Sequence, residues 1–105
     1  MSRARQYELD RELNQRLRST KMTDTQTVKD FFFSMSQNIM TPDFVKAGGR
    51  KDFNIIYEVT KGVAFTGEYT YGLSVYEWNG EEYERSDKSQ MYHTLEALTL
   101  ALKEL

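Results

Sequence analysis

The chain has 105 residues, of which 39% are hydrophobic and 29% charged, and its formal net charge is −2. This length predicts a single domain, 1–105, and the apolar and aromatic content argues against a disordered chain. The absence of cysteine excludes disulfides, thiolate metal ligands and cysteine nucleophiles. No apolar run approaches the roughly 18 residues of a membrane span, and the first residues, from Met1 to Glu8, lack the apolar stretch of a secretion signal. We therefore expect a cytoplasmic protein without a membrane partner.

Charge is distributed unevenly along the chain. Residues 1–51 carry ten Lys/Arg against six Asp/Glu, a balance of +4, whereas residues 52–105 carry four against ten, a balance of −6. Such bipolarity can steer association with a charged partner, although it does not specify a fold.

The N-terminal segment is rich in helix-forming residues and contains neither Gly nor Pro over positions 3–19. Leu9, Leu13 and Leu17 recur every four residues and form a narrow apolar stripe. We predict a basic helix within 1–21 that is mostly solvated and frays, because so little apolar surface stabilises it.

A second helix is predicted by the capping box from Thr23 to Gln26. Behind it, the apolar residues recur with the period of one helix face: Val28, Phe31, Phe32, Met35 and Ile39. Phe33 and Met40 lie off this face, so the helix is apolar around much of its girth. We therefore expect it to be central to the fold.

A short third helix is the interpretation of the next segment. Thr41-Pro42 suits a helix start, since Pro is favoured at the first helical position. Asp43–Ala47 would form the helix, and Gly48-Gly49 would end it.

The apolar period changes to two after residue 52, which indicates strands. The first alternating set is Phe53, Ile55, Tyr57 and Val59. We predict a turn at Lys61-Gly62 and a short strand or arm over Val63–Phe65. A second alternating run from Tyr69 ends at Asn79-Gly80, the strongest short hairpin signal, and Glu81–Ser86 forms the return strand.

The predicted hairpin has two different faces. A two-residue loop at Asn79-Gly80 places Tyr76 opposite Tyr83, on the same face as Trp78. This aromatic cluster is either cross-strand packing or an exposed binding platform. Five carboxylates surround the tip: Glu77, Glu81, Glu82, Glu84 and Asp87. They are either a solvated edge that discourages aggregation or an acidic epitope.

The C-terminal part is predicted to be a polar linker, Asp87–Gln90, followed by a helix that starts at about Thr94. One face of this helix carries Leu95, Leu98, Leu102 and Leu105. The predicted fold class is α+β: two N-terminal helices plus a short third, a three- to four-stranded antiparallel sheet, and a C-terminal helix packed on the sheet.

Signals of catalysis are missing from the sequence. The lone histidine, His93, does not make a usual zinc site without cysteine. The carboxylates gather on a hairpin tip, and no pattern implies the desolvated pair that acid–base catalysis needs. The Gly48-Gly49-Arg50-Lys51 stretch suits a turn better than a phosphate site. We expect no enzyme activity, no metal and no cofactor.

The leading interpretation is a small non-enzymatic protein-binding module, a regulator or inhibitor. Its expected contact residues are Tyr76, Trp78, Glu81, Tyr83 and Glu84. In one version the acidic hairpin imitates nucleic-acid charge and occupies a nucleic-acid-binding partner. Such a small chain would suit an accessory protein of a mobile genetic element.

Two alternatives remain open. The first is a nucleic-acid-binding accessory protein whose basic N-terminal helix contacts phosphate through Arg3, Arg5, Arg11, Arg16 and Arg18. The second is a homodimer formed through Leu9, Leu13 and Leu17 together with the second helix.

Overall fold

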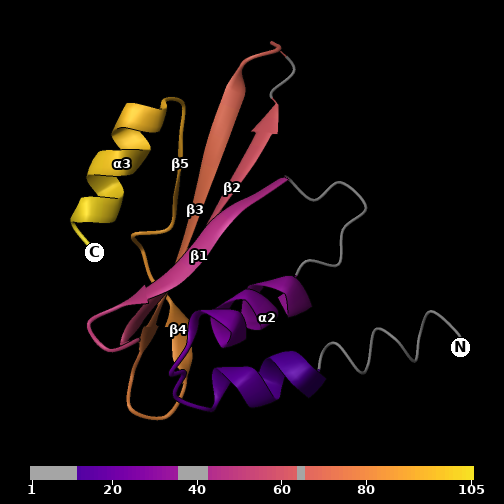
Figure 1. Ribbon diagram of the computed structural model, residues 1–105, viewed down its shortest axis with the longest axis vertical. Coiled ribbons are helices and arrows are strands. Elements are labelled where there is room, and N and C mark those ends of the chain that lie inside the picture. Colours follow the sequence, from indigo (N-terminus) through magenta and orange to yellow (C-terminus); the bar gives the residue numbers. More distant parts are fainter. Residues whose placement is uncertain (1–11, 36–42, 64–65) are drawn as a thin grey trace, which may run out of the picture.

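The computed structural model describes residues 12–35, 43–63 and 66–105, which form an antiparallel sheet with helices on both faces (Figure 1). A helix over residues 12–18 and helix α2 (Thr25–Met35) cover one face, and helix α3 (Leu95–Lys103) covers the other. The predicted α+β class, the antiparallel sheet and the C-terminal helix are confirmed. Within the described ranges, no helix is both long and apolar enough to cross a membrane.

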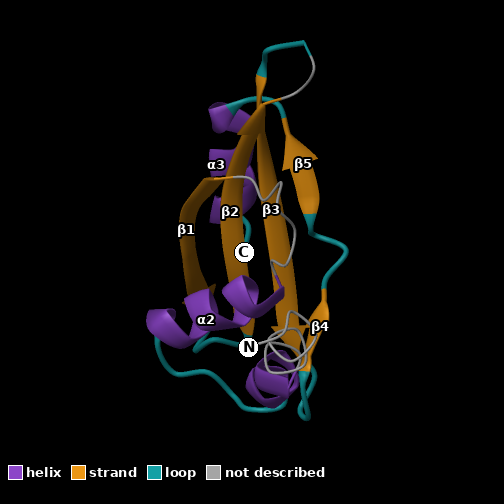
Figure 2. Cartoon of the chain, turned by 90° about the vertical axis from the view of Figure 1, so that its right-hand side faces the viewer, coloured by secondary structure: helices purple, strands orange, loops and turns teal. Residues whose placement is uncertain are grey.

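The sheet contains five strands, and Figure 2 shows them edge to edge. Their order is β1-β2-β3-β4, with β5 also pairing with β3. The strands are β1 (Asp43–Arg50), β2 (Ile55–Val63), β3 (Tyr69–Trp78), β4 (Tyr83–Arg85) and β5 (Gln90–Tyr92). Because β4 pairs with one end of β3 and β5 with the other, they form one interrupted edge.

A short outward loop separates β4 from β5, and two serines keep it attached to β3. The Ser86 N–H donates to the Val75 carbonyl at 2.8 Å. The Ser89 hydroxyl accepts from the Val75 N–H at 2.9 Å and lies 3.1 Å from the Val75 carbonyl, to which it donates. The backbone of β3 is therefore satisfied while Asp87 and Lys88 lie exposed outside the ladder. Strand β5 was not predicted: the predicted polar linker, Asp87–Gln90, overlaps it only at Gln90, and no strand was expected over the residues that follow.

The predicted short helix over Asp43–Ala47 is wrong, because these residues belong to β1. A single helical turn leaves most of its backbone groups unpaired, whereas β1 pairs along nearly the full length of β2. Gly48 and Gly49 do not end a helix. They let aromatic rings lie against the strand: the Tyr57 ring covers Gly48, and the Phe53 ring covers Gly49. The predicted start at Thr41-Pro42 lies outside the described residues.

The turns on either side of β2 also differ from prediction. Lys61-Gly62 is not a turn, because β2 continues through it to Val63. Before β2, the residues 51–53 form a turn in which each φ is positive, 52°, 56° and 61°. Phe53 therefore lies in this turn rather than in the strand. The Asn54 N–H donates to the Lys51 carbonyl at 3.1 Å and closes the turn.

The caps of the two complete helices follow ordinary side-chain chemistry. Thr94 caps α3 as predicted, since its hydroxyl accepts from the Ala97 N–H at 3.1 Å. For α2, the cap is Asp24 rather than the predicted Thr23, with the Thr27 N–H 2.8 Å from its carboxylate. This backbone bond, with a second from the Thr27 hydroxyl, lowers the pKa of Asp24.

Two separate cores result from the two covered faces. The aliphatic core, under α3, consists of Ile55, Tyr57, Val59, Leu73, Val75, Leu98, Leu102 and Leu105. The aromatic core, under α2, consists of Met22, Val28, Phe31, Phe32, Ile56, Tyr76 and Tyr83. The two sets alternate along β2 and β3, as the strand period requires.

Candidate functional site

The β3–β4 hairpin turns over four residues rather than the predicted two. Trp78 pairs with Tyr83, and Tyr76 pairs with Arg85. The predicted pairing of Tyr76 with Tyr83 is therefore wrong by two positions. Because this shift is an even number of residues, each side chain stays on its predicted face.

Asn79 explains the longer loop. Its side-chain oxygen accepts from the N–H groups of Glu81 and Glu82, both at 2.8 Å. Its backbone N–H donates to the Glu82 carbonyl at 3.0 Å. Gly80 supplies the left-handed conformation, with φ 104°. These bonds favour a closed four-residue loop over the tighter two-residue turn.

The aromatic cluster of the hairpin faces inward. Tyr83 is fully buried and Tyr76 is 9% exposed, because α2 covers this face. The Phe31 ring meets the Tyr76 ring edge-on, with ring centres 5.1 Å apart, and the Trp78 ring is tilted against the Tyr83 ring, with ring centres 4.9 Å apart. Cross-strand and core packing thus describes this cluster, and an exposed platform does not. Tyr76 and Tyr83 lie out of reach of a partner, while Trp78 is only partly buried.

The Tyr83 hydroxyl connects three distant segments. It accepts from the Met22 N–H at 2.9 Å and donates to the Phe53 carbonyl at 2.9 Å. Burial raises the pKa of this phenol, against the opposing effect of the Met22 N–H. The loop end of the hairpin is consequently fixed to the segment between the two N-terminal helices and to the β1–β2 turn.

The acidic tip, defined as Glu77, Glu81, Glu82, Glu84 and Asp87, is built on this anchored hairpin. Glu77 and Glu84 lie opposite each other on one face. Lys88 offsets their repulsion, with its Nζ 3.9 Å from a Glu77 oxygen. This pair is nearly half exposed, so it is weak. Glu81 in the closed loop, Glu84 in β4 and Asp87 in the loop after β4 are all exposed. The roles predicted for Trp78, Glu81 and Glu84 stay predictions.

The N-terminal arginines are only partly described, since Arg3, Arg5 and Arg11 lie outside the described residues. Arg16 is exposed, as a phosphate contact requires. Arg18 instead packs on the aromatic core. Its guanidinium carbon lies 6.0 Å from the Phe31 ring centre and 5.7 Å from that of Tyr76. Arg18 is therefore engaged in the fold, which weakens the nucleic-acid alternative.

The leucine stripe and the lone histidine are placed as follows. Leu9 lies outside the described residues, Leu13 is exposed and Leu17 packs against the aromatic core. His93 is exposed immediately before the Thr94 cap. Across residues 12–35, 43–63 and 66–105, no three His, Asp or Glu side chains gather closely enough to hold a metal ion.

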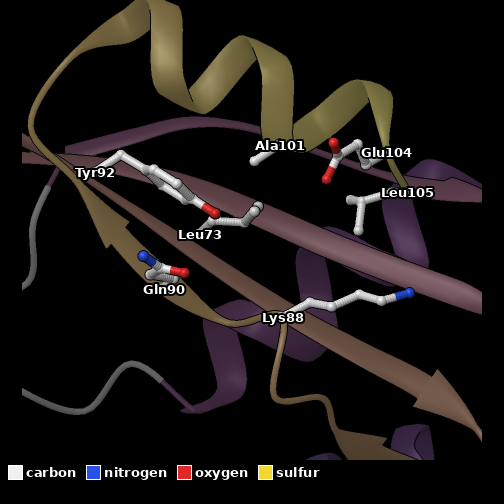
Figure 3. A pocket seen from close by; sticks show the side chains of 7 residues that line it. All are labelled: Leu73, Lys88, Gln90, Tyr92, Ala101, Glu104 and Leu105. Carbon is white, nitrogen blue, oxygen red and sulfur yellow. The ribbon is translucent and has the colours of Figure 1, made fainter.

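A pocket that sequence analysis did not foresee lies between α3 and β5 (Figure 3). Leu73 and Tyr92 form its floor, the Glu104 carboxylate reaches in from α3, and Lys88 lies on the opposite side. Its volume of about 250 Å³ is below the roughly 300–1,000 Å³ of small-molecule sites. It does not compete with the acidic tip as the candidate site.

No protein-family model, curated protein or solved structure matches this chain.

Proposed function

We propose that this chain is a small protein-binding module, a regulator or inhibitor, that contacts its partner through the acidic tip and the exposed part of Trp78. The observation that supports this most is the closed loop: Asn79 holds the backbone of Glu81 and Glu82 by three hydrogen bonds. A loop that is already ordered loses little conformational entropy when it binds.

The charge of the tip specifies the partner's chemistry. Carboxylates at the ordered tip favour a partner with a basic surface. The phosphate-binding surface of a nucleic-acid-binding protein is basic in this way. Trp78 lies beside them, partly buried against Tyr83, and offers the aromatic anchor that protein interfaces favour. An inhibitor of a nucleic-acid-binding protein is the specific version of the proposal.

Quantitative affinity capture from the native host tests this proposal. The variant Glu81→Gln/Glu84→Gln removes two exposed charges. It keeps the backbone hydrogen bonds that close the loop, because these involve no carboxylate. The matched control, Glu96→Gln/Glu104→Gln, removes two exposed charges from the α3 region. We expect the wild type and the control to retain a basic partner that the tip variant loses, because the contact is electrostatic. Equal capture by both variants would refute a role for the acidic tip.

A second arm separates inhibition from simple binding. If the captured partner binds nucleic acid, excess wild-type chain should displace that nucleic acid, and the tip variant should not. Simultaneous binding of both ligands would contradict the charge-imitation version. Direct binding of DNA or RNA by the chain itself, weakening steeply with salt, would instead favour the arginine-based alternative.

A further inference from the structure

Strand β1 is an edge strand with an apolar border. Among the described residues it pairs with β2 alone, so its outer backbone groups face no other described strand. Figure 2 shows β1 at one edge of the sheet and β4 and β5 at the other. Phe44 and Val45 in this strand are 50% and 45% exposed.

Helix α2 adds a third aromatic or aliphatic side chain to this border. Phe33 is 79% exposed, although it directly follows the buried Phe31 and Phe32. It follows Lys29 by one helical turn, and the Lys29 Nζ lies 5.8 Å from the Phe44 ring centre. Phe33 is therefore on the side of α2 that overlooks β1. An exposed apolar strip beside an open edge is typical of an interface.

We propose that β1 pairs antiparallel with β1 of a second copy, about a two-fold axis that passes between the two Ala47 residues. The proposal is independent of the acidic tip, which lies at the other side of the sheet. It rests on the register of the two strands. In this register, opposite charges meet, large side chains meet glycines, and paired residues lie on the same face of the sheet.

The bulge in β1 determines which of its residues share a face of the sheet, and therefore which residues can pair across the two-fold axis. Phe44 pairs with Thr60 and Lys46 with Val59, so Val45 is an extra residue. Phe44 consequently faces α2 together with Ala47 and Gly49. The remaining paired residues face α3: Asp43, Lys46, Gly48 and Arg50. When Ala47 opposes its own copy, every later pair joins residues of the same face.

Three pairs then repeat on each side of the axis. Arg50 lies opposite Asp43 of the second copy, which gives two opposite-charge pairs per dimer. Phe44 lies opposite Gly49, where no side chain obstructs it, and beside the Phe53 ring that covers that glycine. Lys46 lies opposite Gly48, which has no side chain of its own, and beside the Tyr57 ring that covers this glycine. The charged side chain, usually a deterrent to edge pairing, therefore faces neither a bulky partner on the opposing strand nor a like charge.

The opposite edge of the sheet explains why such an assembly closes. There, the loop at Asp87 and Lys88 interrupts the ladder between β4 and β5. An interrupted edge is a poor template for another strand. A two-fold pairing of β1 uses the edge that a single strand forms in each copy, and it yields a closed dimer rather than a filament.

Charge reversal tests the register by sedimentation equilibrium over a range of concentrations. Asp43→Arg alone, or Arg50→Asp alone, turns both attractive pairs into repulsive ones. We expect each to raise the dimer dissociation constant about tenfold or more, and the double variant to restore it. A chain that is monomeric at every concentration overturns the proposal, and so does a dimer that both single variants leave unchanged.

A cysteine scan tests the axis. Because the chain has no cysteine, Ala47→Cys introduces a single thiol directly opposite its own copy. Facing Cα atoms in an antiparallel pair are about 4.5–5.5 Å apart, within the range of a disulfide. We expect mild oxidation to convert Ala47→Cys into a covalent dimer, and the control Lys46→Cys to cross-link far less. Equal cross-linking, or a dimer lost only in Leu13→Glu, would assign the contact elsewhere and overturn the proposal.

Discussion

The two faces of the sheet are stabilised in different ways. Under α3, the aliphatic core consists mostly of Ile, Val and Leu side chains, which contribute by burial and shape alone. Under α2, the aromatic core adds directional contacts. The Tyr83 hydroxyl bonds the Met22 N–H, 61 positions away, and Arg18 lies over Phe31 and Tyr76.

A second polar link on the α2 face joins the two N-terminal helices. The Asn14 amide donates to the Ser34 hydroxyl at 3.0 Å, and that hydroxyl donates to the Phe31 carbonyl. Helix α3 needs no such links, because it directly follows β5 and packs on the adjacent strand. The difference shows that segments distant in sequence are held on the sheet by polar bonds in addition to apolar contact.

The largest expected effect comes from emptying each core in turn. Phe31→Ala should cost about 3–5 kcal/mol, and Leu98→Ala about 2–5 kcal/mol, because both side chains are buried. Phe31 should cost more, since it also loses ring contacts with Phe32, Tyr76 and Tyr83. Urea denaturation gives both free energies of unfolding. A larger loss for Leu98→Ala would mean that the aliphatic core dominates stability.

An intermediate effect is expected from Tyr83→Phe. Loss of the hydroxyl leaves the Met22 N–H without its acceptor, which costs about 1–3 kcal/mol. The matched control is Tyr57→Phe in the aliphatic core, whose hydroxyl makes no hydrogen bond to any described residue. Its free energy of unfolding should change little. Similar losses in the two variants would remove the distinction between the two cores.

The smallest effect concerns Glu58, which lies on the α2 face between Ala47 and Ser74. Burial raises the pKa of this carboxyl above its ordinary 4.5. The folded state therefore holds the proton more tightly than the unfolded chain, and stability falls as pH rises through that window. Glu58→Gln should raise the melting temperature at pH 7 and have no such effect below pH 4.

The exposed variant Glu81→Gln serves as the control for Glu58. It should leave the melting temperature nearly unchanged at both pH values, because its carboxylate is solvated. The relevant quantity is the difference in melting temperature between Glu58→Gln and the wild type. If this difference is the same at pH 7 and below pH 4, the Glu58 side chain is not desolvated in the folded state.

Local sequence signals determined much of the fold. The Thr94 cap, the alternation from Ile55 to Val59 and the alternation in β3 depend on neighbouring residues, and they were predicted correctly. Of the predicted leucine face, Leu98, Leu102 and Leu105 are buried, whereas Leu95 in the first turn of α3 is 60% exposed. Asn79-Gly80 also marked the position of the hairpin turn. These features depend on backbone conformation and side-chain period, which act over a few residues.

The tertiary structure decided what those signals left open. Segment 43–50 became a strand because β2 offers it partners and because Tyr57 and Phe53 lie against its glycines. The alternation of side chains along the strands placed Tyr76 and Tyr83 on the same face of the sheet. It did not show that this face is buried, because burial depends on where α2 packs. The sequence by itself therefore determined α2, α3, the central strands β2 and β3 and the acidic tip, but neither β1 nor β5. Which surfaces stay open depended on contacts between residues far apart in the chain, and no local pattern encodes them.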